Sequence, residues 1–156
     1  MTEQIKKEII KMDAIPCFFN TFKIGADETS ATSISEIEEM SLELEQTIIE
    51  YPTFDSMGKT KRVKLITGVK ASLNGKRNHN DVGNNFLAKV AASDLSDAYF
   101  YFELNIPDLT VKMPQAIAEM GTRGGAVNDL DKLEVTIINH GLFDTIFTED
   151  EIVEGE

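Results

Sequence analysis

Apolar and polar residues alternate along much of this chain, and a period of two residues is typical of strands with one buried face. The clearest case is Ala98–Ile106, where alternate apolar residues are expected to face the core: Phe100, Phe102, Leu104 and Ile106. Similar alternation predicts strands over Ala14–Ile24, Met40–Ile48, Val63–Leu73, Thr110–Glu119 and Leu133–Ile137, and a shorter one over Leu142–Phe147. The expected core residues of the first three are Phe18, Phe22 and Ile24; Met40, Leu42, Leu44 and Ile48; and Val63, Leu65, Val69, Ala71 and Leu73.

Two segments have helical spacing instead. Asn80-Asp81 supplies an N-cap, and apolar residues follow at helical intervals from Val82 to about Ser93. The segment Thr2–Met12 is compatible with a short amphipathic helix carrying Ile5, Ile9 and Met12 on one side, or with an arm that orders on contact with a neighbour. Because the strands follow one another without βαβ alternation, we predict a mainly β fold with one flanking α-helix, an antiparallel β-sandwich or barrel.

The length of 156 residues is that of one domain. We expect an N-terminal arm or short helix over residues 1–13, a single β domain over 14–148 and a flexible acidic tail over 149–156. The lone Cys17 excludes an internal disulfide, and no run of 18 apolar residues predicts a membrane span. The amino terminus also lacks the apolar region of a signal peptide, so a cytoplasmic product is expected.

The net charge of −12 argues against a conventional nucleic-acid-binding protein, which needs a cationic surface to displace phosphate counterions. The charges also occur in blocks. Asp27–Glu50 has eight acids and no Lys or Arg, whereas Tyr51–Arg77 has seven bases and one acid. These blocks are either solvated faces or the acidic and basic surfaces through which neighbouring subunits meet.

No catalytic or metal-binding constellation is evident in the sequence. The Gly-rich MGTRGGAVN at 120–128 lacks the ending of a phosphate-binding loop and predicts a flexible turn. Neither His79 nor His140 has a ligand partner at metal-binding spacing, and Cys17 is expected to be a buried, inert thiol. We therefore predict no cofactor, no metal and no enzyme activity. On the polar face of their strand, Tyr99 and Tyr101 either lie under a loop or anchor an interface.

The segment Tyr51–Ala88 carries a more specific pattern. In order, it contains Tyr51-Pro52, a loop with Gly58, the basic pair Lys61-Arg62, LITG at 65–68, LNGKR at 73–77 and DVGNNFLA at 81–88. This order and spacing resemble the major tail tube proteins of long-tailed bacteriophages. The similarity covers about a quarter of the chain, and the strand order elsewhere is compatible with it.

The resemblance implies a subunit that forms hexameric rings, which stack into a hollow tube through which DNA passes without specific binding. It implies a location in the virion tail, assembly in the bacterial host cytoplasm, and tape-measure, tail terminator and distal tail proteins as partners. The candidate contacts between rings or subunits are Lys59, Lys61, Arg62, Lys76, Arg77, Tyr99 and Tyr101. A candidate acidic face on the lumen or an interface comprises Glu39, Glu43 and Glu45.

Two alternatives remain open at this point. One is a related tube-forming protein of a contractile tail, a phage-like bacteriocin or a secretion system. The other is a soluble ligand-binding β-barrel or an enzyme, which would be monomeric or dimeric and have a deep apolar pocket.

Overall fold

The computed structural model describes residues 3–148, so the tail expected over 149–156 lies outside the described residues. The elements are α1 (Glu3–Ile9), the 3-10 helix η1 (Cys17–Phe19), β1 (Thr21–Gly25), β2 (Thr32–Ser33), β3 (Ile37–Pro52), β4 (Thr60–Lys76), α2 (Val82–Ala91), the 3-10 helix η2 (Leu95–Ala98), β5 (Phe100–Ile106), β6 (Leu109–Gly124), β7 (Lys132–Asn139) and β8 (Asp144–Phe147).

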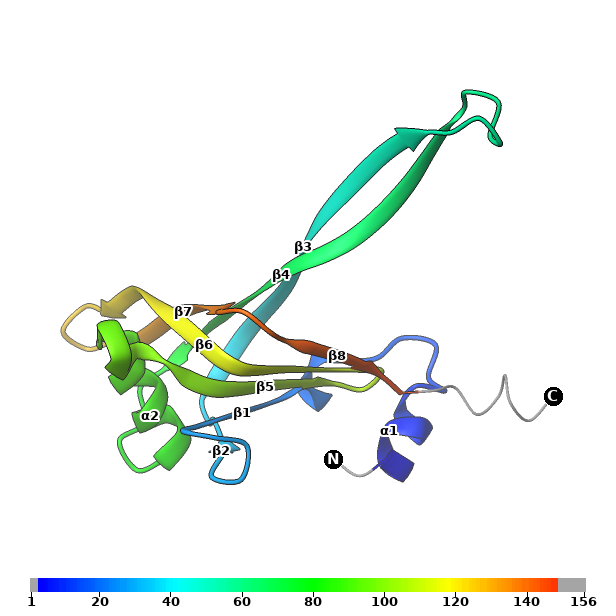
Figure 1. Cartoon of the computed structure of the whole chain (residues 1–156). Helices are drawn as coiled ribbons and strands as arrows, with labels where there is room; N and C mark the ends of the chain where they lie inside the picture. Colours follow the sequence, from blue (N-terminus) through cyan, green and yellow to red (C-terminus); the bar gives the residue numbers. More distant parts are fainter. Residues whose placement is uncertain (1–2, 149–156) are drawn as a thin grey trace.

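The described strands form one antiparallel sheet in the order β2-β1-β5-β6-β7-β4-β3. The short β8 pairs with the start of β6, while β7 pairs with its second half. The sheet curves so that β1 and β3 approach each other, and the Asn20 amide lies 3.6 Å from the sulfur of Met40. Helix α2 packs beside β1, β2 and β6 (Figure 1). The prediction of a mainly antiparallel β fold with one flanking helix is confirmed.

The core lies between the inner face of the curved sheet and α2. The alternate residues expected from β5 are at its centre, with Phe100, Phe102 and Leu104 at most 2% exposed. The inward residues of the neighbouring strands and of α2 complete it: Val69, Ala71, Leu73, Leu87, Val90, Val111, Met113, Leu133, Val135 and Ile137. Alternation therefore predicted this part of the core correctly.

The start of α2 is fixed by three residues of the DVGN sequence. The Asp81 carboxylate accepts hydrogen bonds from the backbone N–H groups of Asn84 (2.8 Å) and Ser35 (3.1 Å), as an N-cap that also holds the preceding loop. Gly83 lies so close to the Ser33 carbonyl that any Cβ would collide with it. The fully buried Asn84 donates to the carbonyls of Ser35 and Lys76, so this motif joins the helix to the sheet.

The strand predicted over Ala14–Ile24 begins only at Thr21. Pro16 lacks a backbone N–H and precedes the single 3-10 turn η1, which places Phe18 at 78% exposure instead of in the core. Cys17 is exposed as well, so the prediction of a buried thiol is wrong.

Strand β6 is longer than predicted and reaches Gly124. Phe100 and Phe102 of β5 pair with Ala116 and Met113 of β6, so β6 has one extra residue at this point. Pro114 lies in this irregularity and pairs with no residue of β5, which is why a residue without an N–H is tolerated here.

The connection between β6 and β7 was expected to be a flexible turn, but polar contacts hold its ends. Arg123 pairs with Asp131 at 2.5 Å, and the Gly124 N–H donates to the same carboxylate at 2.7 Å. These two hydrogen bonds, the one from Arg123 first, lower the pKa of Asp131.

Helix α1 packs against the outer face of β5 and β6. Its inward residues are Ile9 and Lys6, which are 4% and 5% exposed, whereas Ile5 and Met12 of the predicted apolar stripe are each 47% exposed. The Lys6 ammonium donates to Asn105 Oδ1 (3.2 Å) and Thr110 Oγ1 (3.0 Å). A buried lysine thus joins this helix to the polar side of the sheet.

Candidate functional site

The most prominent feature is the β3–β4 hairpin, whose outer half leaves the body of the protein as a two-stranded ribbon (Figure 1). Strand β4 pairs with β7 only over Lys70–Lys76, while its pairing with β3 continues to Thr60. Beyond that point each strand of the ribbon has only the other as a hydrogen-bonding neighbour among the described strands. A ribbon of this kind is marginally stable unless something packs on it.

The ribbon exposes large apolar side chains on both faces. Ile48 is 58% exposed, although alternation assigned it to the core, and its neighbour Ile49 is 48% exposed. Val63 and Leu65 were also expected to be inward, but they are 41% and 43% exposed. The core positions predicted for the outer half of the hairpin are therefore wrong, whereas those of the inner half are correct.

Val63 and Leu65 are exposed because the ribbon leaves the body, and a register shift also changes the face of β4 on which they lie. Glu45 lies opposite Gly68, but Gln46 lies opposite Ile66, so Thr67 is an extra residue. Directly opposed residues of two paired strands lie on the same face of the sheet. Beyond the extra residue, the residues of β4 that would have faced one side of the ribbon therefore face the other. Val63 and Leu65 consequently lie opposite Ile49 and Thr47, on the face that carries the outward acids of β3.

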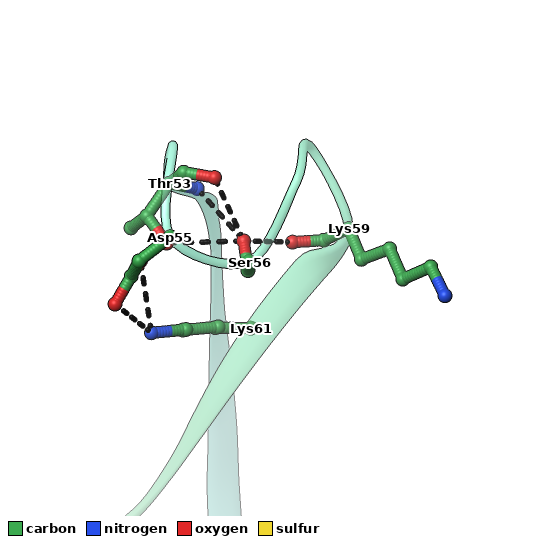
Figure 2. A network of polar contacts seen from close by, with 5 residues as sticks. All are labelled: Thr53, Asp55, Ser56, Lys59 and Lys61. Atoms are coloured by element: carbon green, nitrogen blue, oxygen red, sulfur yellow. Dashed lines mark hydrogen bonds and ion pairs between the residues drawn. The ribbon is translucent and has the colours of Figure 1, made fainter.

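The tip of the hairpin, Thr53–Lys59, is ordered by its own polar groups (Figure 2). The Ser56 hydroxyl accepts from the Thr53 N–H (3.2 Å) and lies 2.8 Å from the Lys59 carbonyl. The Thr53 hydroxyl donates to the Asp55 carboxylate, and Lys61 pairs with that carboxylate at 3.3 Å. The hydrogen bond from Thr53, followed by that from Lys61, lowers the pKa of Asp55.

Two apolar side chains project from this ordered tip. Phe54 is fully exposed at 104%, and Met57, in the left-handed conformation at φ 57°, is 88% exposed. Their neighbour Lys59 has no ion pair among residues 3–148, and its side chain points away from the tip network (Figure 2). Sequence reasoning missed Phe54 and Met57. The available signal was two large apolar residues within an otherwise polar loop.

The other predicted basic contacts have partners within the chain. Lys61 pairs with Asp55, Arg62 with Glu50 at 3.0 Å, and Lys76 with Glu38 at 2.8 Å. Arg77 is half-buried, and its guanidinium donates to Asn84 Oδ1 at 2.9 Å. Arg77 therefore supports the start of α2, while the exposed pairs on the hairpin are weak enough to exchange partners.

The predicted tyrosine pair is divided between two environments. Tyr99 is 38% exposed and its ring centroid lies 4.9 Å from that of His140. Tyr101 is only 4% exposed, as expected if this side of the strand is covered within the chain. Its hydroxyl donates to Glu103 at 2.7 Å, and burial together with this carboxylate raises the pKa of Tyr101.

The three predicted acids, Glu39, Glu43 and Glu45, are all exposed on β3, at alternate positions that share one face. Strand β3 is also a terminal strand of the sheet, and its second edge has no partner among the described strands over 16 residues. A long unpaired edge is a template for pairing with another chain. The acidic face and the open edge therefore belong to the same strand.

The described residues contain no group of three or more His, Cys, Asp and Glu side chains placed to hold a metal ion. Within the same range, neither helix has the length and apolar character of a membrane span. His79 and His140 are both exposed. The hairpin, its tip and the open edge of β3 are therefore candidate functional surfaces.

Neither a protein-family model nor a curated protein sequence matches the chain. Similar solved structures exist. A chain in the sheath–tube complex of an extracellular contractile injection system, PVC, has 13% identity and a TM-score of 0.54, over 94% of this chain and 99% of that one. A chain in the virion of a native gene transfer agent particle has 13% identity and a TM-score of 0.53, over 80% and 95%.

A third likeness is to a chain in the cap of the anti-feeding prophage, described as its tube terminating cap. It has 11% identity and a TM-score of 0.53, over 87% of this chain and 93% of that chain. At these identities the likeness concerns the fold. The chain shares its fold with chains of particles that have phage-like tails or tubes, and the likeness extends over nearly the full length of each of those chains.

Proposed function

We propose that this protein is a structural subunit of a tail tube, whose copies form hexameric rings that stack into a hollow tube. The observation that carries the proposal is the β3–β4 hairpin, a ribbon with exposed apolar side chains on a fold shared with chains of tail-bearing and tube-bearing particles. Such a hairpin is explained by copies that cover one another's surfaces.

The exposed surfaces support assembly of many copies rather than a closed dimer. The open edge of β3 can pair with a strand of a neighbour, and the hairpin can reach a different surface of another copy. A contact between two different surfaces is heterologous, so it generates a ring if it closes and a filament if it does not. A stack of rings needs both kinds of contact, one that closes within each ring and one that continues from ring to ring.

The charge of the protein supports passage of DNA through the tube without binding. A net charge of −12 repels phosphates, and Glu39, Glu43 and Glu45 form an exposed acidic face that is the candidate lumen or interface surface. In this account the protein is not an enzyme and needs no cofactor. Its partners are other copies of itself and the tape-measure, tail terminator and distal tail proteins, and its location is the virion tail after assembly in the host cytoplasm.

The hairpin is proposed to make the contacts between rings. Of its predicted basic contacts, Lys59 is the residue without an ion pair among residues 3–148, whereas Lys61 and Arg62 would have to exchange Asp55 and Glu50 for acids of the adjacent ring. Tyr99 and Lys76, both partly accessible, are proposed as contacts between subunits.

A second candidate is a tube protein of a contractile system. The coverage of 94% of this chain by a chain from a sheath–tube complex favours it. Both candidates share the ring and differ in whether a sheath surrounds the tube. A sheath gene beside the gene for this protein would favour the contractile system.

Negative-stain electron microscopy over a concentration series tests the proposal. We expect six-fold rings or tubes whose number rises with concentration, because association is driven by mass action. Particles the size of single subunits at every concentration, including after addition of the distal tail protein as an initiator, would contradict it.

A further inference from the structure

A surface pocket lies where the segment after α1 meets the β5–β6 turn and the end of β8. Its volume is about 460 Å³, and apolar residues form much of its wall: Ile10, Ile15, Pro16, Pro107 and Phe147. Phe147 and Ile15 are themselves 69% and 36% exposed, so apolar surface continues from the pocket onto its rim. An apolar concavity of this size is typical of a site that receives a ligand or a side chain.

The hairpin tip provides matching convex apolar groups. Phe54 and Met57 are the two most exposed large apolar residues of the hairpin, at 104% and 88%. The hydrogen bonds of Thr53 and Ser56 hold the loop that presents them, so little freedom of the loop backbone remains to be lost on insertion. The tip is therefore preorganised as a projection.

The charges beside the two surfaces are opposite. Lys59 lies next to the two apolar tip residues and has no ion pair among residues 3–148. Asp108 belongs to the pocket wall, is exposed, and likewise has no ion pair in that part of the chain. Opposite charges at the rim of an apolar contact select the orientation of the partner.

The tip cannot fill the pocket of its own chain as the chain is folded. The ribbon leads away from the body (Figure 1), and none of the pocket-lining residues belongs to β3, β4 or the tip. A projection and a receptor at different places on one chain produce a heterologous contact that repeats from copy to copy. The occupant that fits these observations is a second copy of the protein.

We propose that Phe54 and Met57 of one copy insert into this pocket of a copy in the adjacent ring, with Lys59 beside Asp108. This inference rests on the proposed function and identifies the surface that receives the hairpin. Along the tube axis, the hairpin tip of each copy would then bind the pocket of the next copy.

The native Cys17 provides the test, because it lies in the pocket wall and is the only cysteine of the chain. A Met57→Cys variant of the full-length protein, incubated at assembling concentration with a short bis-maleimide, should give a ladder of covalent oligomers. Mass spectrometry should find position 57 linked to Cys17. The matched control is Val127→Cys, which places an equally exposed thiol (Val127 is 99% exposed) in the β6–β7 turn and should give no link to Cys17.

The outcomes separate the inference from the proposed function. A link between positions 57 and 17 that disappears in Met57→Cys/Cys17→Ser supports the inference, whether or not tubes are seen. Tubes without that link overturn the inference and leave the tube function standing, with a different occupant for the pocket. Neither tubes nor a link, with the variant folded by circular dichroism, overturns both.

Discussion

At the residue scale, the motif DVGN at 81–84 shows why particular residue types occur where they do. Asp81 caps α2, Gly83 allows the helix to approach the Ser33 carbonyl, and Asn84 satisfies buried backbone carbonyls on two segments. The roles of Asp81 and Asn84 need their polar side chains, and the role of Gly83 needs the absence of a side chain. This motif, one of the features on which the resemblance to tail tube proteins rests, is thus a structural joint between helix and sheet.

The role of Gly83 gives a prediction about stability. In an ordinary helix, Gly→Ala stabilises by up to about 1 kcal/mol. Here the new methyl group collides with the Ser33 carbonyl, and overpacking costs about 1–3 kcal/mol. We therefore expect Gly83→Ala to lower the free energy of unfolding by about 1–2 kcal/mol in urea titrations.

The control is Val82→Ala, one residue earlier on an exposed position, which should change the free energy of unfolding by less than about 0.5 kcal/mol. A Gly83→Ala variant as stable as the wild type would show that the loop before α2 moves aside readily. The described packing at this joint would then be incorrect.

At the element scale, the strands and α2 were predictable where local patterns decide them. The alternation in β5 and the cap of α2 are properties of neighbouring residues, and both predictions are confirmed. The faces of the hairpin were not predictable, because the extra residue Thr67 acquires its meaning only from the register with β3. Cys17 was misplaced for a related reason. Its exposure depends on how sequence-distant segments pack around it.

The contact proposed between the tip and the β5–β6 turn predicts a charge-swap experiment. Lys59→Glu alone and Asp108→Lys alone should each raise the critical concentration for assembly several-fold, because a rim ion pair contributes up to about 1 kcal/mol and a like-charge pair opposes binding. The double variant Lys59→Glu/Asp108→Lys should recover most of the loss. Light scattering over a concentration series measures all three.

The control for the swap is Lys89→Glu, which makes the same change of net charge on the exposed side of α2. If this control behaves like Lys59→Glu, the effect arises from net charge. If the double variant assembles no better than either single variant, the two residues are not neighbours in the assembly.

At the scale of the whole molecule, the chain combines a well-packed body with surfaces that a monomer leaves uncovered. The body holds the apolar core, while the hairpin and its tip carry exposed apolar groups and the edge of β3 has no partner among the described strands. Burying the side chains of Phe54 and Met57 would contribute about 1.5–3 kcal/mol each.

The most direct test of the account compares electron micrographs of the wild type and of Phe54→Ser/Met57→Ser at the same concentration. Both tip side chains are at least 88% exposed, so the double variant should fold with an unchanged circular dichroism spectrum. We predict tubes from the wild type and isolated rings or subunits from the variant. Tubes of equal number and length from both proteins, or no assembly of the wild type at any concentration even after addition of the distal tail protein, would contradict it.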